Sequence, residues 1–197
     1  MVYFKNTLQS FFWGIITAGI SLLFQLIIIS FVLNDYATSP TDQAFLGTFI
    51  FLIIYALTEE SFKYLIVFKK ILPLSYGKGF LFNAWIGGLG FSLLEAYIIY
   101  QKNIYEHISF DLLDVVKTAP LHILTFGTLG YFLATQENRG LNFKILSFNF
   151  IIHLIYNYSI IYLENYSQPI TLSITILLII INFYGFLIVN KKLASNE

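Results

Sequence analysis

The sequence contains no cysteine, which excludes disulfide bonds, thiolate metal ligands and cysteine nucleophiles. Charged residues are also scarce: they make up 11% of the 197 residues, with 11 basic and 11 acidic side chains. A formal net charge of zero provides no basic surface for binding nucleic acid. Hydrophobic residues, in contrast, account for 57% of the chain. This composition is typical of a protein that is mostly embedded in a lipid bilayer.

Apolar runs of about 20 residues, the length that crosses a bilayer as a helix, indicate the architecture. Six such runs are present, at residues 8–33, 44–68, 79–100, 112–133, 145–163 and 170–189. The connections between them are too short for a soluble domain, and the sequence shows no repeat. It therefore predicts an all-α fold, a polytopic membrane bundle of about six transmembrane helices that forms a single domain over residues 1–197.

The distribution of lysine and arginine predicts how these helices are oriented. Eight of the 11 basic residues lie on one side of the predicted bundle: Lys5, Lys69, Lys70, Lys78, Arg139, Lys144, Lys191 and Lys192. The opposite side is mainly acidic, with Asp35, Asp42, Glu106, Asp111 and Glu164. Because cytoplasmic loops are enriched in lysine and arginine, we expect both termini in the cytoplasm and the protein in the cell membrane.

The second apolar run contains three ionisable residues, Glu59, Glu60 and Lys63. A charge near the centre of a bilayer costs roughly 2.5 to 3.5 kcal/mol on insertion scales, so each of these groups needs a partner. Lys63 follows Glu59 by four residues and Glu60 by three, so it can neutralise either carboxylate on one helical face. A buried ion pair that only fixes helix packing explains Lys63 and one glutamate. It leaves the second glutamate unexplained, which favours a functional site.

The third apolar run carries an acid and small residues on a common face. Ala84, Gly88, Phe91 and Glu95 follow one another at helical spacing. Ala84 and Gly88 permit close approach of another helix. We therefore expect Glu95 to face neighbouring helices rather than lipid.

The fourth and fifth runs each contribute a histidine. Pro120 precedes His122 and removes a backbone donor, so a kink is one expectation for this helix. An alternative is that the span starts with Thr118 as its N-cap, which would move His122 towards the outer surface. In the fifth run, polar residues recur every four positions and form one stripe: Asn149, His153 and Asn157.

Ionisable groups on four of the predicted helices lie at similar depth, within about six residues or ~9 Å of the midpoint of their helix. These groups are Glu59, Glu60, Glu95, His122 and His153. They can share one cavity, and glutamate, histidine and asparagine are side chains that activate water and bind a developing oxyanion. Hydrolysis inside the membrane is therefore the leading hypothesis.

Other polar groups have simpler interpretations. Taken one at a time, an intramembrane histidine can be a packing contact between helices, and Glu95 can be the partner of Lys63 or of a histidine. His107 falls in a predicted outer loop and is expected to be solvated. The first run carries a weak polar stripe, which we interpret as helix packing: Thr17, Ser21 and Gln25.

Four motifs between Glu59 and Asn157 resemble those of a known family in their order and spacing. Residues Glu59 to Lys63 are similar to an EExxK motif, and Phe91 to Glu95 to an FxxxE motif. His122, and His153 with Asn157, are similar to the third and fourth motifs of PrsW-type intramembrane proteases. This family is related to the CAAX-processing and bacteriocin-processing membrane endopeptidases. The motif-bearing core would then span residues 44–163 of a single integral membrane protease domain.

The resemblance implies roles for these residues. Glu59 and His122 would activate the attacking water, and His153 with Asn157 would stabilise the tetrahedral intermediate. Glu60 would assist by polarisation or proton transfer, Lys63 would hold the glutamate pair, and Glu95 would support the site. PrsW-type proteins are described as metalloproteases. In an alternative interpretation, Glu59 or Glu60 therefore binds a zinc ion together with His122 and His153.

The choice between these two routes is open on the sequence. There is no HExxH motif, in which two histidines one turn apart define a zinc site, and histidines on separate helices fit both routes. We favour the metal-free route slightly and name no certain cofactor. The resemblance also implies a membrane-anchored protein substrate, such as an anti-sigma factor of a bacterial stress response. The protein would then lie in the bacterial cytoplasmic membrane.

Two rival functions are also considered. The third-helix glutamate is followed by Ala96 where the family often has asparagine, and CAAX-related proteins include members that act by binding. A catalytically silent membrane scaffold or bacteriocin-immunity factor is therefore the main rival. A proton-coupled transporter is the second rival, because buried Glu, His and Lys also form proton relays. It has less support, since no helices are broken at equivalent places in two repeated halves. The sequence predicts no oligomeric state.

Overall fold

The computed structural model describes residues 2–36, 41–74, 79–105, 107, 112–135 and 142–194. Within these ranges the long helices are α1 (Val2–Tyr36), α2 (Thr41–Ile66), α4 (Gly79–Tyr105), α5 (Leu112–Thr135), α6 (Phe143–Tyr162) and α7 (Ser167–Ala194). A π-helical turn η1 (Val67–Ile71) and the short α3 (Leu72–Leu74) continue from α2, and a 3-10 turn η2 (Glu164–Tyr166) joins α6 to α7. No strand occurs in these ranges. The all-α fold is confirmed, and each apolar run corresponds to one long helix.

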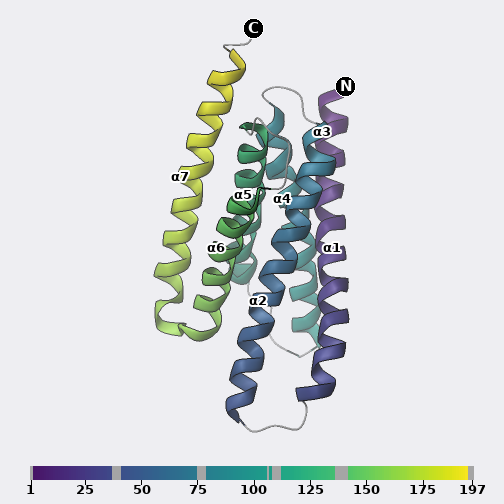
Figure 1. Ribbon diagram of the computed structural model, residues 1–197, viewed down its shortest axis with the longest axis vertical. Coiled ribbons are helices and arrows are strands. Elements are labelled where there is room, and N and C mark those ends of the chain that lie inside the picture. Colours follow the sequence, from purple (N-terminus) through teal and green to yellow (C-terminus); the bar gives the residue numbers. More distant parts are fainter. Residues whose placement is uncertain are drawn as a thin grey trace.

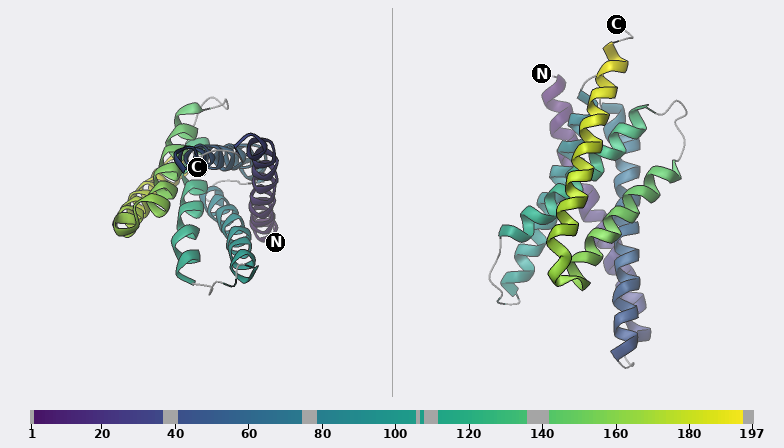
Figure 2. Two further views of the ribbon diagram at one scale, coloured as in Figure 1. Left: turned by 90° about the horizontal axis from the view of Figure 1, so that it is seen from below. Right: turned by 90° about the vertical axis from the view of Figure 1, so that its left-hand side faces the viewer.

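The long helices run side by side as a bundle (Figure 1). The start of α1 and the end of α7 lie at the same end of this bundle, and α5 and α6 are inclined to α1 and α2 (Figure 2). Several residues used to predict the orientation lie outside the described part of the chain, among them Lys78, Glu106, Asp111 and Arg139. The cytoplasmic location of both ends therefore stays a prediction.

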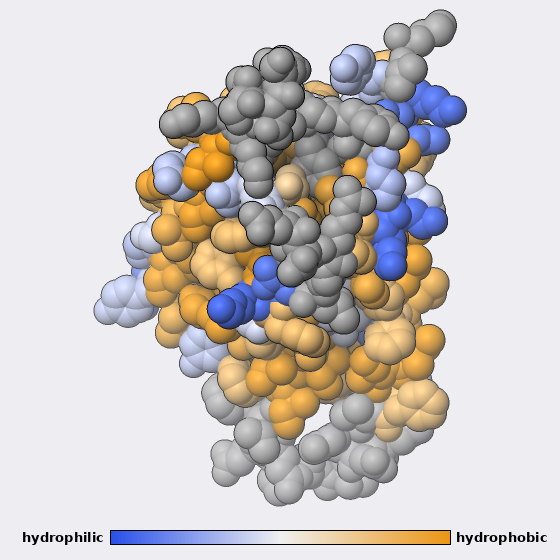
Figure 3. Space-filling view, turned by 45° about the horizontal axis from the view of Figure 1, so that its top comes forward, coloured by the Kyte–Doolittle hydropathy of each residue, from blue (hydrophilic) through white to orange (hydrophobic). Residues whose placement is uncertain are grey.

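The outer surface of the bundle is apolar. Four helical stretches of the described chain are long and apolar enough to cross a membrane: Tyr3–Phe31, Leu81–Tyr105, Phe143–Tyr162 and Ser167–Ile188. Their outward side chains include Phe31, which is 74% exposed, and Phe183, which is 62% exposed. Figure 3 shows large apolar patches on one face of the molecule, with hydrophilic residues gathered towards its upper right. Exposed apolar side chains in this number are suited to lipid rather than water.

Glycines allow α4 to pack closely against both α1 and α5. A Cβ atom at Gly90 would lie 2.1 Å from the carbonyl oxygen of Phe11 on α1, so only glycine fits there. A Cβ atom at Gly88 would lie 2.6 Å from Cα of Ile123 on α5. The close helix approach predicted from the small residues of this run is confirmed. It brings Glu95 of α4 into contact with His122 of α5.

The helix α5 begins earlier in the chain than the alternative with Thr118 as N-cap predicted. It begins at Leu112 and includes Pro120, so Thr118 lies inside the helix and the N-cap assignment is wrong. The hydroxyl of Ser92 on α4 donates a hydrogen bond of 3.2 Å to the carbonyl oxygen of Ala119, beside the proline. His122 is only 1% exposed and faces the interior of the bundle. It is therefore available to the other polar groups there.

Candidate active site

The two adjacent glutamates of α2 have different surroundings. Glu60 is fully buried, and its Oε1 atom lies 2.6 Å from Nζ of Lys63, which is also fully buried. The side chain of Glu59 is 15% exposed and lines a cavity. Lys63 therefore pairs with Glu60, three residues away, and Glu59 has no lysine partner in this pairing.

Lys63 connects α2 to α5. Its Nζ atom lies 2.8 Å from Nδ1 of His122 and donates to Oγ1 of Thr125 at 3.3 Å. It also lies 4.8 Å from the centre of the Phe91 ring on α4, a distance suited to a cation–π contact. A lysine ammonium has three N–H donors, and Glu60, His122 and Thr125 provide three acceptors. A buried charge with this many partners fixes the positions of its neighbours.

His122 contacts protein groups through both ring nitrogens. Nδ1 faces Lys63, and Nε2 contacts Oε2 of Glu95. Because a lysine ammonium only donates, Nδ1 accepts in this contact, and the ring proton lies on Nε2 and is donated to Glu95. The ring also packs against Phe91, with ring centres 4.7 Å apart. On α4, Phe91 thus packs against the His122 ring, and Glu95 contacts its Nε2 atom.

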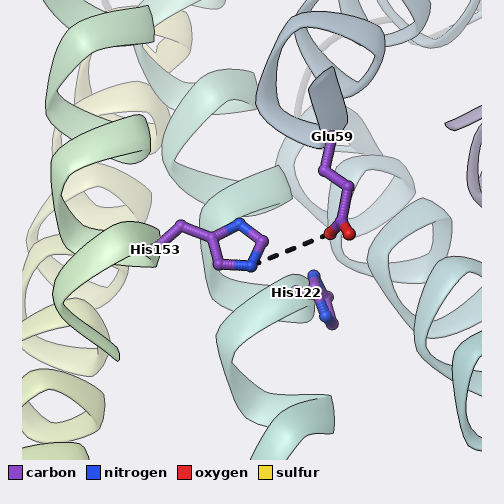
Figure 4. Close-up of side chains that lie close together, drawn as sticks. All are labelled: Glu59, His122 and His153. Atoms are coloured by element: carbon purple, nitrogen blue, oxygen red, sulfur yellow. Dashed lines mark ion pairs between the residues drawn. The ribbon is translucent and has the colours of Figure 1, made fainter. Parts of the chain in front are cut away.

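His153 of α6 lies between the two glutamates. Its Nδ1 atom is 2.7 Å from Oε1 of Glu60, and its Nε2 atom is 3.7 Å from Oε2 of Glu59. Figure 4 shows His153 and His122 both directed towards Glu59, from different helices. When a carboxylate accepts the proton of one imidazole nitrogen, the other nitrogen keeps a lone pair that can bind a metal. This is the usual arrangement of a metal-bound histidine. Glu60 therefore turns the free nitrogen of His153 towards Glu59.

Glu59, His122 and His153 can hold a metal ion. Each offers one ligand atom, and these atoms lie within 4.8 Å of one another. Oε2 of Glu59 is buried and has no hydrogen-bond partner in that part of the chain. Two ligands at about 2.0 to 2.2 Å from a tetrahedral zinc ion lie roughly 3.4 Å apart, close to the separation of Glu59 and His153. Coordination by His122 would exchange one of its present contacts for the ion.

The cavity beside these residues has a volume of about 350 Å³. Its walls come from α1, α2, α4, α5 and α6, and they include Glu59, Glu95 and Asn157. On α2 the lining residues end at Glu59, and on α5 they come before His122. On α4 they begin at Phe91, and on α6 they come after His153. The cavity therefore lies in the half of the bundle away from the chain ends.

The structure brings together Glu59, Glu60, Lys63, Glu95, His122 and His153. Asn157 lines the cavity one turn beyond His153 on α6. Asn149, one turn before His153, is buried and donates a hydrogen bond of 3.0 Å to the carbonyl oxygen of Thr125, which is a packing role. His107 is exposed, as expected.

Two residues of the site were missed by the sequence analysis. Gln25 on α1 donates from Nε2 to Oε1 of Glu59 at 3.0 Å, although its stripe was interpreted as helix packing. Thr125 on α5 accepts from Lys63 and donates to the carbonyl oxygen of His122. The available signals were the four-residue spacing on α1 and a hydroxyl one turn after His122. Neither signal identifies a partner on another helix.

Comparison with known families decides the classification. A family model for PrsW family intramembrane metalloproteases matches residues 4–186. This chain belongs to the PrsW family. The match covers most of α1 and most of α7 as well as the four motifs, and the protein is accordingly a multi-pass membrane protein and an intramembrane metalloprotease. No similar curated protein and no similar solved structure was found. The description of the PrsW family favours a metal centre over the metal-free route that the sequence analysis preferred slightly.

Proposed function

We propose that the protein hydrolyses a peptide bond in or near the membrane-spanning segment of a membrane-anchored protein. The observation that carries this proposal is the convergence of Glu59, His122 and His153 beside a cavity inside the bundle. Hydrolysis in a membrane needs confined water, a group that activates the water and a space for the peptide. The polar groups at the cavity are suited to the first two needs, and its apolar walls to the third.

Glu59, His122 and His153 would hold the metal ion of this metalloprotease. Two histidines and one glutamate are a known donor set of catalytic zinc sites. When bound, the ion supplies a Lewis acid beside the scissile bond. The family resemblance left two roles for Glu59, activation of the water or binding of zinc. Its buried Oε2 atom, which has no partner among the described residues and lies near both histidines, favours Glu59 as a ligand.

The surrounding residues have supporting and proton-transfer roles. Glu60 accepts the Nδ1 proton of His153 and so fixes the orientation of its ring, while Lys63 offsets the charge of Glu60. Glu95 is the second carboxylate on the cavity wall, with a side chain about 30% exposed, and it accepts the proton of the attacking water. Asn157 lines the same wall and donates its amide N–H to the developing oxyanion.

The substrate reaches the site from the half of the bundle away from the chain ends. With both termini in the cytoplasm and six spans, as the basic residues predict, this half faces away from the cytoplasm. The cleaved bond then lies in the outer half of the membrane, as in an anti-sigma factor that is released by cleavage near its spanning helix. Residues 1–197 act as one protease domain in this proposal, with the core at residues 44–163.

The proposal is tested with purified protein in phospholipid vesicles that contain zinc. A panel of single-span reporter proteins, differing in the residues of their spanning segment, serves as substrate. We expect cleavage of at least one reporter, loss of cleavage with a zinc chelator, and recovery when zinc is added back.

His153→Ala should lose both cleavage and bound zinc, measured by elemental analysis of the purified protein. His107→Ala is the matched control, because His107 is exposed and outside the site, and it should retain both. Cleavage that resists the chelator and survives His153→Ala would contradict the proposed site.

A further inference from the structure

The cavity has a polar wall that comes from α1, outside all four family motifs. Ser21 and Gln25 lie one turn apart on this helix and line the same cavity as Glu59. Both are buried, at 1% and 7% exposure. Their neighbours Leu23 and Leu26 are 62% and 52% exposed and face outwards. One narrow inward strip of an otherwise apolar helix is therefore polar.

The hydroxyl of Ser21 differs from the other buried hydroxyls of this helix. Ser10 donates to the carbonyl oxygen of Asn6 at 2.9 Å, and Thr17 to that of Trp13 at 2.6 Å. This bond to the preceding turn is the usual one for a hydroxyl inside an apolar helix. Oγ of Ser21 has no hydrogen-bond partner among the described residues. A buried hydroxyl without a partner costs free energy, which points to a ligand that completes it.

Gln25 links this wall to the reacting groups. Its Nε2 atom donates to Oε1 of Glu59 at 3.0 Å, so the wall and the carboxylate are held in one arrangement. A glutamine amide also has a second N–H and an acceptor oxygen. A peptide lying along Ser21 and Gln25 would pass directly beside Glu59.

An unwound peptide is the ligand that needs such a wall. A helix inside a membrane satisfies its own backbone groups, and its carbonyl groups are closed to attack. A segment opened for hydrolysis exposes several N–H and C=O groups in an apolar surrounding, where each requires a partner. Other lining residues include Leu22, Leu52 and Ile160, which suit apolar side chains of a spanning segment.

We propose that Ser21 and Gln25 form a substrate subsite that binds the backbone of an unwound stretch of the spanning segment beside Glu59. This inference rests on the proposed function, because it requires a membrane-spanning peptide as substrate. It predicts a preference for reporters with a glycine pair at the depth of Glu59, since glycine lowers the stability of the helix that must open.

The first experiment locates the reporter in the full-length protein in vesicles. A photo-reactive amino acid replaces Leu22, which lines the cavity, or Leu23, which faces outwards, in the His153→Ala background to prevent turnover. The probe is the glycine-pair reporter. We expect cross-links to the reporter from position 22 and only background from position 23. Equal yields at both positions, or none at 22, would overturn the subsite.

The second experiment compares two buried serines of α1 in the otherwise natural protein. Ser21→Ala should raise KM for the reporter, expressed as its mole fraction in lipid, about five- to tenfold with little change in kcat, as for loss of one hydrogen bond in binding. Ser10→Ala removes a hydroxyl that is already satisfied and should leave KM unchanged. Equal KM values for the two variants would overturn the subsite.

The outcomes separate this inference from the function on which it rests. A wild-type protein that cleaves reporters but gives neither cross-links at position 22 nor a KM effect of Ser21→Ala lacks the subsite only. A zinc-loaded wild-type protein that cleaves no reporter fails both proposals.

Discussion

Glu59 and Glu60 are adjacent in the sequence and of the same chemical type, yet they lie in opposite surroundings. Glu60 is fully buried, with one oxygen between Lys63 and His153. Glu59 is partly exposed at the cavity and is not the partner of Lys63, although each of the two glutamates keeps one buried oxygen without a hydrogen bond to the described residues. Successive residues of a helix point about 100° apart, so a single step separates a carboxylate paired with a lysine from one that faces the cavity. The comparison teaches that one motif provides both a residue that supports the site, Glu60, and a residue that faces the cavity, Glu59.

The largest expected effect comes from the cavity side of this pair. Glu59→Gln should lower kcat for reporter cleavage by about 10³-fold, because it removes a proposed metal ligand. Zinc content should fall with it, while the free energy of unfolding changes by less than about 1 kcal/mol, since no lysine is left unpaired. Cleavage assays, elemental analysis and unfolding in mixed detergent micelles measure the three quantities. A Glu59→Gln protein with full zinc and full activity would remove the distinction between the two glutamates.

The next effect is on stability and comes from the buried side. Lys63→Met should lower the free energy of unfolding by about 3 to 5 kcal/mol, because it leaves Glu60 buried without its cation. Unfolding in mixed micelles measures the change. The double variant with Glu60→Gln should recover much of the loss, since no buried charge then remains. If the double variant were as unstable as Lys63→Met alone, packing rather than charge would explain the effect.

Glu95 provides a sharper test of the division between metal binding and proton transfer. Glu95→Gln should lower kcat by about 10²-fold, because the amide cannot accept a proton from water. Unlike Glu59→Gln, it should leave the zinc content unchanged. Parallel cleavage and metal measurements on the two variants show whether the carboxylates have different roles. Equal loss of zinc in both would assign Glu95 to the metal site.

The smallest expected effect concerns Thr125, which belongs to the buried side. Thr125→Val should cost about 1 kcal/mol of unfolding free energy, because it removes an acceptor of Lys63. Thr128→Val is the matched control, since Thr128 lies on the same helix but bonds Leu124 and Asn182. In double-variant cycles with Lys63→Met, Thr125 should couple by about 0.5 to 1 kcal/mol and Thr128 should not. Equal coupling would exclude a specific network around Lys63.

Much of the architecture follows from the sequence. The apolar runs located the long helices because hydropathy and helical period are local properties. The small residues before Glu95 predicted a close helix contact, and Gly88 makes one against α5. The four-residue stripe on α6 put His153 and Asn157 on one face, and in the structure His153 is buried and Asn157 lines the cavity.

Other features depend on how the helices are rotated and packed. Spacings of three and four residues allowed Lys63 to pair with either glutamate, and only the positions of His122 and His153 select Glu60. The spacing of Gln25 on α1 could not show that its amide meets Glu59, because that contact joins residues 34 positions apart. The sequence by itself determined the helices and the residue types available for hydrolysis. Only the tertiary structure decided which of these groups are compensated and which face the cavity, because that depends on contacts between helices rather than within them.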